Sequence, residues 1–375
     1  RTPLGRRGGA LSGTHPADLL GGLLRTLVDR TGIDPNVVDD VVGGCVMQVG
    51  EQSTNVTRNA WLAAGLPEAV PATTVDRQCG SSQQAVHFAA QGVIAGAYDV
   101  AVACGVESMS RIPLGANAET YGSPVPASMD ARYDGHLVHQ GISAELIAER
   151  WGISREEMDD FGARSHTLAG AAADAFAEEI VPTPGTDGAL LTRDEGVRVP
   201  DREKMATLKP AFREDGLVTA GSSSQITDGA AALLITTPEK ARELGLRPRA
   251  RFHQFAVVGD DPVFMLTAPI PATRRVLERA GMRLDEMDAV EINEAFASVV
   301  LAWKRELGID GAWFEEHVNP RGGAIALGHP VGASGARLMT TLLHHLEQTG
   351  GRFGLQTMCE GGGLANATII ERIAA

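Results

Sequence analysis

Short, uninterrupted apolar runs alternate with helical patterns along the chain. The runs at 39–43, 99–104 and 231–236 lack the apolar–polar alternation of a strand with one exposed face. Such runs are typical of strands in a sheet that is covered on both faces. Helical patterns at 16–30 and 81–95 accompany them. Together these patterns predict an α/β fold.

Two distant segments of the chain resemble each other. Residues 31–41 and residues 280–290 each begin at the end of a helical pattern, with Gly as the second residue. A short turn and a strand pattern containing Val follow in both. The similarity predicts two halves with similar folds, although general helix–turn–strand composition would produce the same pattern.

The segment 113–224 differs in character from the regions on either side of it. Seven prolines interrupt it, and helical patterns at 142–151 and 155–179 lie between them. We interpret it as an insertion that covers the core, which is a common place for a substrate lid. The predicted organisation is an N-terminal half at 1–112 and 225–247, an inserted loop domain at 113–224, and a C-terminal half at 248–375.

The charge of the chain narrows the classes of function. Its 375 residues include 33 Lys and Arg against 47 Asp and Glu, which gives a formal net charge of −14. We expect no nucleic acid partner, because no basic field is present to neutralise a phosphate backbone. A small anion would have to bind through local cations or backbone N–H groups.

The longest uncharged stretch, residues 78–98, has about the length of a membrane span. It contains Ser, Gln and His side chains, so we interpret it as a buried helix and expect no membrane association. Four cysteines without a visible apolar leader argue against a disulfide scaffold, and we expect a cytoplasmic protein. The sequence begins with Arg1 rather than Met, so a missing targeting segment stays open.

Cys79 lies between a strand pattern and the helical pattern at 81–95. At a helix N-terminus, unpaired N–H groups and the helix dipole favour a thiolate. Gly80 permits the sharp turn that this position needs. We therefore consider Cys79 a candidate reactive thiol; the alternative is a buried cysteine that only packs.

Two glycine-rich segments near the C-terminus carry further candidates. His329 lies in a loop with five glycines, where the backbone can approach a reactant; the alternatives are a solvated turn histidine and a phosphate loop, and the loop lacks the Lys-Ser/Thr ending of the latter. Cys359 precedes the three glycines at 361–363, whose N–H groups suit an oxyanion. The alternative there is a tight turn with an incidental thiol.

The remaining polar candidates divide into one functional position and several packing positions. Asn293 follows a strand pattern, where its amide either positions a water or an imidazole or caps a helix. We assign Cys45 and Cys104 to packing. No C-x-x-C pair is present and the adjacent histidines at 344–345 lie in a helical pattern, so we expect no metal site. A serine hydrolase is disfavoured, because Gly-Ala-Ser-Gly is not the G-x-S-x-G elbow.

Four blocks in this order resemble the thiolases over essentially the whole chain. They are Gln-Cys-Gly-Ser-Ser at 78–82, Asn-Glu-Ala-Phe at 293–296, Gly-His-Pro-x-Gly-x-Ser-Gly at 328–335 and Cys-x-Gly-Gly-Gly at 359–363. The resemblance implies a five-layered α/β/α/β/α fold, made of two similar halves with an inserted loop domain. It also implies a homodimer or a homotetramer.

The resemblance implies a role for each reactive position. Cys79 would be the acyl-accepting nucleophile, His329 its base, and Cys359, with a pKa near the operating pH, the general acid/base at the α-carbon of acetyl-CoA. Asn293 would hold a water that forms one oxyanion hole with His329, and the N–H groups of Cys79 and Gly361 would form the other. The implied reaction is reversible, ping-pong thiolytic cleavage of 3-ketoacyl-CoA, with coenzyme A as co-substrate and no permanently bound cofactor.

The resemblance also implies a set of substrate contacts: Leu208, Phe212, Ala220 and Ser224 toward CoA, with His139, Gln140, Met265 and Phe296 completing the site. The sequence departs from the family in the CoA-binding stretch at 222–227. It also has Gln140 where short-chain acetoacetyl-CoA thiolases usually have Met. This polar wall favours a degradative enzyme, of fatty-acid or related β-oxidation, with a longer or bulkier acyl group.

Three alternatives are weighed against this interpretation. A biosynthetic, acetoacetyl-CoA-forming thiolase would use the same residues in the other direction. A decarboxylating ketoacyl synthase pairs its cysteine with His/His or His/Asn, which the Cys359 block disfavours. A silent binding or scaffold homologue is expected to have lost a reactive position, and none is missing. A disulfide between Cys79 and Cys359 stays open.

Overall fold

The computed structural model describes residues 1–119 and 122–374. Positions 120, 121 and 375, which belong to the predicted inserted and C-terminal segments, lie outside the described residues. The helices are α1 (Pro16–Thr31), α2 (Val56–Ala63), α3 (Ser81–Ile94), α4 (Ala116–Glu119), α5 (Ala127–Arg132), α6 (Gln140–Arg150), α7 (Arg155–Ala171), α8 (Arg202–Ala206), α9 (Pro238–Glu243), α10 (Pro269–Ala280), α11 (Ala297–Glu306), α12 (Gly311–His317), α13 (Ala324–Leu327) and α14 (Ser334–Thr349). The strands are β1 (Gly5–Arg6), β2 (Asp40–Gly44), β3 (Ala72–Val75), β4 (Val100–Ser108), β5 (Thr183–Pro184), β6 (Leu190–Leu191), β7 (Thr227–Thr236), β8 (Ala250–Gly259), β9 (Ala289–Ile292), β10 (Phe353–Glu360) and β11 (Leu364–Arg372).

Two mixed sheets form the centre of the molecule. The first has the strand order β1-β7-β4-β2-β3, in which β2 is parallel to both β3 and β4. The second has the order β8-β11-β10-β9, in which β9 and β10 are parallel. The strands β5 and β6 form a separate small hairpin. The predicted α/β class is therefore confirmed.

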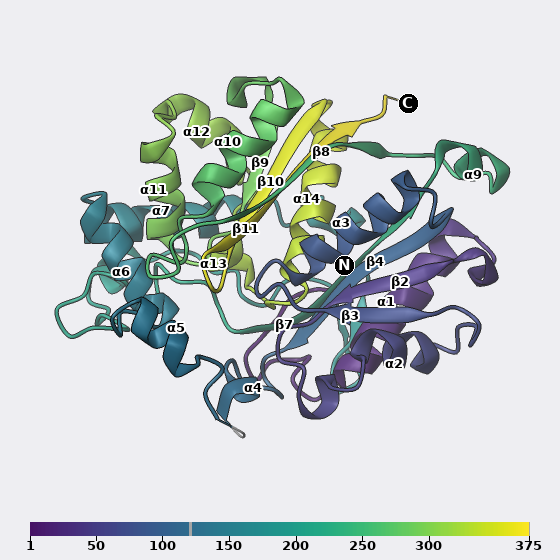
Figure 1. Ribbon diagram of the computed structural model, residues 1–375, viewed down its shortest axis with the longest axis horizontal. Coiled ribbons are helices and arrows are strands. Elements are labelled where there is room, and N and C mark those ends of the chain that lie inside the picture. Colours follow the sequence, from purple (N-terminus) through teal and green to yellow (C-terminus); the bar gives the residue numbers. More distant parts are fainter. Residues whose placement is uncertain (120–121, 375) are drawn as a thin grey trace.

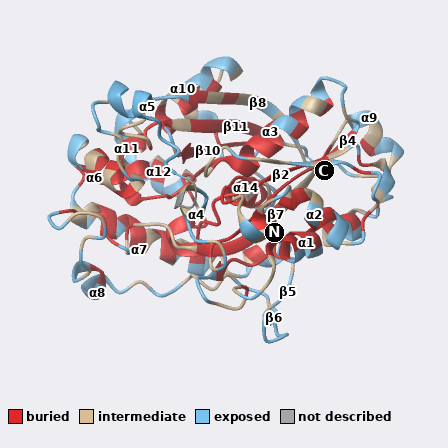
Figure 2. Cartoon of the chain, turned by 60° about the horizontal axis from the view of Figure 1, so that its bottom comes forward, coloured by how far each residue is buried: buried red, intermediate tan, exposed pale blue. Residues whose placement is uncertain are grey.

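Helices cover both sheets and also separate them. In Figure 1, α3 and α14 lie between the two sheets, α1 and α2 cover the outer face of the first, and α10 and α11 cover the outer face of the second. Figure 2 shows burial concentrated in the strands and the two central helices. This is the five-layered α/β/α/β/α arrangement that the resemblance implies, and it places the N-termini of α3 and α14 in the middle of the fold.

The two central helices pack closely because small residues line their contact. Ala85, Ala89 and Ala90 of α3 share a buried cluster with Met339 and Leu342 of α14. At the start of α14, a β-carbon on Gly335 would collide with the backbone nitrogen of Gln83. The absence of side chains at this crossing lets the two helix N-termini approach each other.

Most of the predicted elements are present with small shifts at their ends. The patterns at 16–30, 81–95 and 142–151 correspond to α1, α3 and α6, and the apolar runs correspond to β2, β4 and β7. The helix predicted over 155–179 is wrong beyond Ala171. There the chain leaves the helix and forms the short 3-10 helix Ala175–Glu178, which turns Phe176 into a small core with Leu4 and Leu327.

The two resembling segments have the same local structure. Gly32 after α1 and Gly281 after α10 both adopt left-handed conformations, with φ of 69° and 65°. A single 3-10 turn follows in each case, and then a strand, β2 or β9. The predicted internal similarity is confirmed for these segments.

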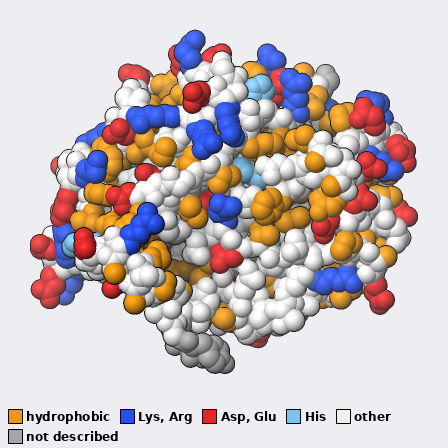
Figure 3. Space-filling model, viewed as in Figure 1, with side chains coloured by type: hydrophobic (Ala, Val, Ile, Leu, Met, Phe, Trp, Pro, Cys, Tyr) orange, Lys and Arg blue, Asp and Glu red, His pale blue; other side chains and the backbone are white. Residues whose placement is uncertain are grey.

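The region between β4 and β7 contains α4 to α8 and the β5–β6 hairpin. In Figure 1, α5, α6 and α7 lie on the side of the molecule toward α11. The exact boundaries of an inserted domain stay a prediction. On the face shown in Figure 3, Lys and Arg side chains are interspersed with Asp and Glu. In the described part of the chain, no helix combines the length and apolar character needed to cross a membrane.

Candidate active site

Cys79 lies in a tightly bonded turn at the N-terminus of α3. Gln78 adopts a left-handed conformation with φ of 49°, and its N–H donates to Asp76 Oδ1 at 2.7 Å. The Ser81 hydroxyl accepts from the Arg77 N–H at 2.9 Å and donates to the Gln78 carbonyl at 2.6 Å. These bonds fix the backbone on both sides of Cys79. The helix itself is capped by Gly80 rather than by Cys79.

The turn between β10 and β11 lies against the Cys79 turn. A β-carbon on Gly361 would lie 3.1 Å from Gln78 Oε1, so the backbone of Gly361 is next to the residue that precedes Cys79. Cys359 belongs to β10, not to the turn that follows, and is fully buried. Nearness to Cys79 adds to the burial that raises the Cys359 pKa well above its ordinary value. The structure therefore places the turns that hold these two thiols side by side, although they are far apart in the sequence.

His329 follows Gly328, which has a φ of 110°, in the loop between α13 and α14. Its N–H donates to the Gln225 carbonyl at 3.1 Å, and only 5% of the residue is exposed. The alternative of a solvated turn histidine is therefore wrong. Two residues later in this loop, Val331 packs in the same apolar cluster as Cys79.

The partners of the imidazole determine its tautomer. Ser334 Oγ donates to the Pro330 carbonyl at 3.0 Å, so it accepts from His329 Nδ1 at 2.6 Å. The proton then resides on Nδ1, and the lone pair of Nε2 accepts a hydrogen bond from Asn293 Nδ2 at 3.4 Å. An imidazole in this state is ready to accept a proton at Nε2.

Both members of the predicted nucleophile–base pair are neutral in the free protein. Although Cys79 is half-buried, its thiol lies deep enough that burial, with a further contribution from Glu360, raises its pKa to about 12. Burial also lowers the His329 pKa to about 3. The prediction that the helix N-terminus favours a thiolate is wrong here, because loss of solvation outweighs the helix dipole. The expected near-operating pKa of Cys359 is wrong for the same reason.

Asn293 follows β9 and is held by its backbone, whose N–H donates to the Thr357 carbonyl at 3.1 Å. It does not cap a helix, because α11 begins four residues later with Phe296 as its N-cap. The Oδ1 atom of Asn293 is buried and has no hydrogen-bond partner within the described residues. A buried acceptor of this kind is a suitable site for a bound water.

Three of the predicted substrate contacts are neighbouring rings. The His139 and Phe212 ring centroids are 5.8 Å apart, and those of Phe212 and Phe296 are 5.6 Å apart. Met265, at a φ of 54°, packs against the same core as Phe212. Gln140 is the first residue of α6, directly after its cap His139.

The predicted CoA contacts lie in the loop before β7. Leu208 packs against Gly221, and the neighbouring Ala220 is exposed. The Ser224 N–H donates to the Ala295 carbonyl at 3.0 Å, which joins this loop to the segment that carries Phe296.

Several residues that hold the site were missed by the sequence interpretation. Ser334 fixes the imidazole, and Glu107 accepts the N–H groups of Val46, Met47 and Gly332, which join the loop after β2 to the His329 loop. The sequence signal for Ser334 was its place in the block at 328–335, and Glu107 lies outside all four recognised blocks. Their partners are distant in sequence, so the pattern could not reveal them.

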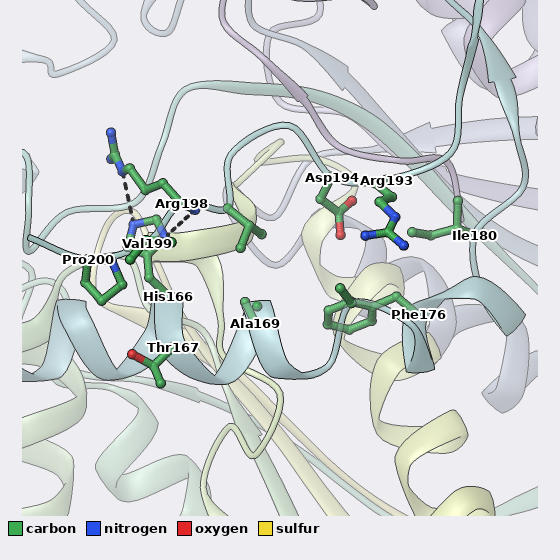
Figure 4. Close-up of a pocket in the computed structure, with 13 residues that line it drawn as sticks. His166, Thr167, Ala169, Phe176, Ile180, Arg193, Asp194, Arg198, Val199 and Pro200 are labelled. Atoms are coloured by element: carbon green, nitrogen blue, oxygen red, sulfur yellow. Dashed lines mark hydrogen bonds between the residues drawn. The ribbon is translucent and has the colours of Figure 1, made fainter.

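A separate cavity of about 630 Å³ lies between α7 and the segment 193–200. Figure 4 shows Phe176, Ile180 and Val199 around it, with Arg198 bonded to His166 at its edge. None of the predicted site residues lines this cavity. Within residues 1–119 and 122–374, no cluster of three or more His, Cys, Asp or Glu suited to a metal ion is found.

Comparison with known proteins decides the family. Residues 1–239 match the N-terminal domain of thiolase, and residues 246–372 match its C-terminal domain. The chain belongs to the thiolase family. As a thiolase it is an acyltransferase, as the resemblance implies.

Relatives of known activity are similar over the whole chain. A steroid 3-ketoacyl-CoA thiolase from Mycobacterium tuberculosis is 52% identical, with 100% of this chain and 92% of that protein covered. A 3-ketoacyl-CoA thiolase from Klebsiella pneumoniae is 44% identical, with 100% and 97% covered. The crystal structure of the Bacillus anthracis acetyl-CoA acetyltransferase has a TM-score of 0.89 at 38% identity, covering 99% of this chain and 96% of that one.

Proposed function

We propose that the protein is a degradative thiolase that cleaves 3-ketoacyl-CoA to acetyl-CoA and a shortened acyl-CoA. The observation that supports this proposal is that three separate segments, which hold the two thiols and the imidazole, lie near one another. Cys79 is near enough to Cys359 to affect its pKa, and Cys79 shares an apolar cluster with Val331 of the His329 loop. This nearness supports the assignment of these residues to acyl transfer.

In the first half-reaction, His329 Nε2 takes the proton from the Cys79 thiol as the sulfur attacks the 3-keto carbonyl of the substrate. The bond between the α- and β-carbons then breaks, and its electron pair leaves with acetyl-CoA as an enolate. Cys359 gives its proton to the α-carbon of this enolate. The products are acetyl-CoA and an acyl group on Cys79.

In the second half-reaction, the thiol of a new CoA molecule attacks the acyl-Cys79 thioester. Its proton is lost to Cys359 and the Cys79 sulfur leaves, so the enzyme returns to its starting state after Cys79 recovers the proton from His329. Separate release of the two products gives ping-pong kinetics. Starting from neutral groups means that the resting enzyme holds no charged thiolate in its buried site; a Cys359 thiolate and a protonated His329 exist together only in the acyl-enzyme.

Negative charge develops on two different oxygens in these steps, and we assign one oxyanion site to each. A water held at the unpartnered Asn293 Oδ1, together with His329, would stabilise the enolate oxygen of acetyl-CoA. The backbone N–H groups of Cys79 and Gly361 would stabilise the tetrahedral intermediate on Cys79. The nearness of Gly361 to the side chain of Gln78, the residue before Cys79, supports this second assignment.

We propose that the inserted segment 113–224 and the loop that follows it bind CoA. Leu208, Phe212, Ala220 and Ser224 would contact the pantetheine and adenine. His139, Gln140, Met265 and Phe296 would line the acyl end of the site, where Gln140 and the steroid specificity named for one relative both favour a bulky acyl group.

The test is the rate of thiolysis against a panel of 3-ketoacyl-CoA substrates, from acetoacetyl to long-chain and ring-bearing acyl groups. We expect the ring-bearing or long-chain substrates to be cleaved fastest, and Cys79→Ala to form no acyl-enzyme. Cleavage restricted to acetoacetyl-CoA would favour the biosynthetic alternative. Inactivity of the wild-type enzyme on the whole panel would favour the scaffold alternative.

We also propose a homodimeric or homotetrameric assembly in the cytoplasm. The strand β3 supports self-association, because it lies at the edge of the first sheet with its outer side unpaired by described strands. Light scattering of the purified protein would determine the assembly. Cell fractionation would determine the location.

A further inference from the structure

Glu360 is a fully buried carboxyl group at the boundary between the two halves. It follows Cys359 at the end of β10, and its side chain extends to the N-terminus of α3, where a β-carbon on Gly80 would overlap its carboxyl group. Both of its oxygens lack a hydrogen-bond partner among the described residues. Burying a carboxyl without partners is costly, and this one directly follows Cys359 and lies beside Gly80, the residue after Cys79.

The groups around Glu360 come from three segments. Arg77 and Cys79 lie in the turn before α3, Cys359 precedes Glu360 on its own strand, and β11 presents the backbone N–H of Asn366 nearby, outside hydrogen-bond geometry. Arg77 and, more weakly, the Asn366 N–H favour the ionised carboxylate. Burial opposes them and prevails, so the Glu360 pKa is raised to about 8. The carboxyl is therefore mainly neutral at pH 7.

We propose that Glu360 controls the reactivity of Cys79 through its own protonation. When Glu360 is neutral, Cys79 can lose its proton without facing a second negative charge. When Glu360 is ionised, its charge opposes a thiolate at Cys79, because two like charges this close cannot both form readily. Glu360 is a positioning residue in this scheme, since it acts on the nucleophile and does not touch the substrate. The inference rests on the proposed function only in taking Cys79 as the nucleophile.

Two features of the geometry support a charge effect over simple packing. Glu360 makes no hydrogen bond that would fix a neighbouring loop, in contrast to Glu107, which accepts three backbone N–H groups. Gly80 also leaves room for the carboxyl directly beside the Cys79 turn. A packing role alone would be served by an apolar side chain of the same size.

The test compares the alkylation of Cys79 by iodoacetamide in the wild type and in Glu360→Gln, from about pH 6 to pH 10. Peptide mass spectrometry separates Cys79 from the other three cysteines. We expect similar rates near pH 6.5, where Glu360 is neutral, and about tenfold faster alkylation of Glu360→Gln near pH 9, for a like-charge effect of about one pKa unit. Identical pH profiles would overturn the proposal.

Asp76→Asn is the matched control, because Asp76 lies in the same turn, is exposed, and has a weaker effect on the Cys79 pKa. We expect its profile to stay close to that of the wild type. An equal acceleration in Asp76→Asn would show that any nearby carboxylate acts alike, and would remove the special role of Glu360. If Glu360→Gln fails to fold, Glu360→Met serves as the uncharged variant, and the wild-type profile alone should flatten near pH 8.

Thermal unfolding gives an independent measurement. The unfolded chain releases the Glu360 proton near pH 4.5, whereas the folded protein keeps it until about pH 8. Glu360 therefore lowers the free energy of unfolding progressively as the pH rises from about 4.5 to about 8. We expect the Tm of Glu360→Gln, relative to the wild type, to increase between about pH 5 and pH 8; parallel curves would contradict the proposal. Neither measurement uses a substrate. A protein that shows the expected alkylation and Tm profiles but cleaves no 3-ketoacyl-CoA would therefore contradict only the proposed function.

Discussion

The ends of β9 and β10 offer a direct comparison, because each places a predicted catalytic residue next to a buried glutamate. These neighbouring parallel strands lead to Asn293-Glu294 and to Cys359-Glu360. Glu294 accepts hydrogen bonds from Ser165 Oγ at 2.6 Å, Asn319 Nδ2 at 2.9 Å and the Ile325 N–H at 3.2 Å. Glu360 accepts none within the described residues.

The difference separates two uses of a buried carboxyl group. Glu294 joins three segments of the chain, since Ser165 lies on α7, Asn319 follows α12, and Ile325 lies on α13. This network holds the backbone of Asn293 and the loop that leads to His329. Glu360 holds no segment in place, so its cost to the fold is not balanced by local bonds. We therefore expect changes at Glu294 to affect folding and changes near Glu360 to affect chemistry.

The largest effect is expected at the Cys359 end of this comparison. Cys359→Ala removes the group that exchanges a proton with the α-carbon, so thiolysis should fall by about 10³-fold, within the usual range for general acid–base catalysis. Acylation of Cys79 by an acyl-CoA should persist. Loss of deuterium from labelled acetyl-CoA, measured by mass spectrometry, should stop in the variant. Washout at the wild-type rate would rule out the role assigned to Cys359.

The next effect concerns stability at the Asn293 end. Glu294→Ala would remove the acceptor of Ser165 Oγ and of one N–H of Asn319 Nδ2, whose other N–H still donates to the Ile292 carbonyl, in a buried site. We expect the free energy of unfolding to fall by about 3 kcal/mol, measured by urea denaturation at pH 7. Glu294→Gln, which keeps one acceptor oxygen, should lose less. A loss below about 1 kcal/mol would mean that the network contributes little to folding.

Much of the fold could be predicted because its strands are covered on both faces. The apolar runs of β2, β4 and β7 carried that signal in the sequence alone. The helix predicted beyond Ala171 was wrong. The Ala-rich sequence there is typical of a helix, but the packing of Phe176 in a cluster with Leu4 turns the chain. That contact joins residues far apart in sequence, and no local pattern contains it.

The sequence predicted which residues form the candidate site, but it did not predict their protonation states. Motif positions identified Cys79, His329, Asn293 and Cys359, and the structure brings their segments together. Sequence reasoning favoured a thiolate at Cys79 from the unpaired N–H groups and the dipole of the helix N-terminus. Burial reverses that expectation, and the depth of a side chain is a property of the whole fold.

The smallest effect is expected at Ser334, which acts on the imidazole that serves both strand ends. Ser334→Ala removes the acceptor for His329 Nδ1, so the ring can adopt the other tautomer and protonate Nε2. We expect kcat for thiolysis to fall by about tenfold, which corresponds to the loss of one good hydrogen bond. Ser334→Thr, which keeps the hydroxyl, is the matched control and should retain most of the activity. An unchanged kcat in Ser334→Ala would show that the assigned tautomer does not depend on Ser334. If Ser334→Thr is impaired at the same time, the added methyl group near the ring limits the rate.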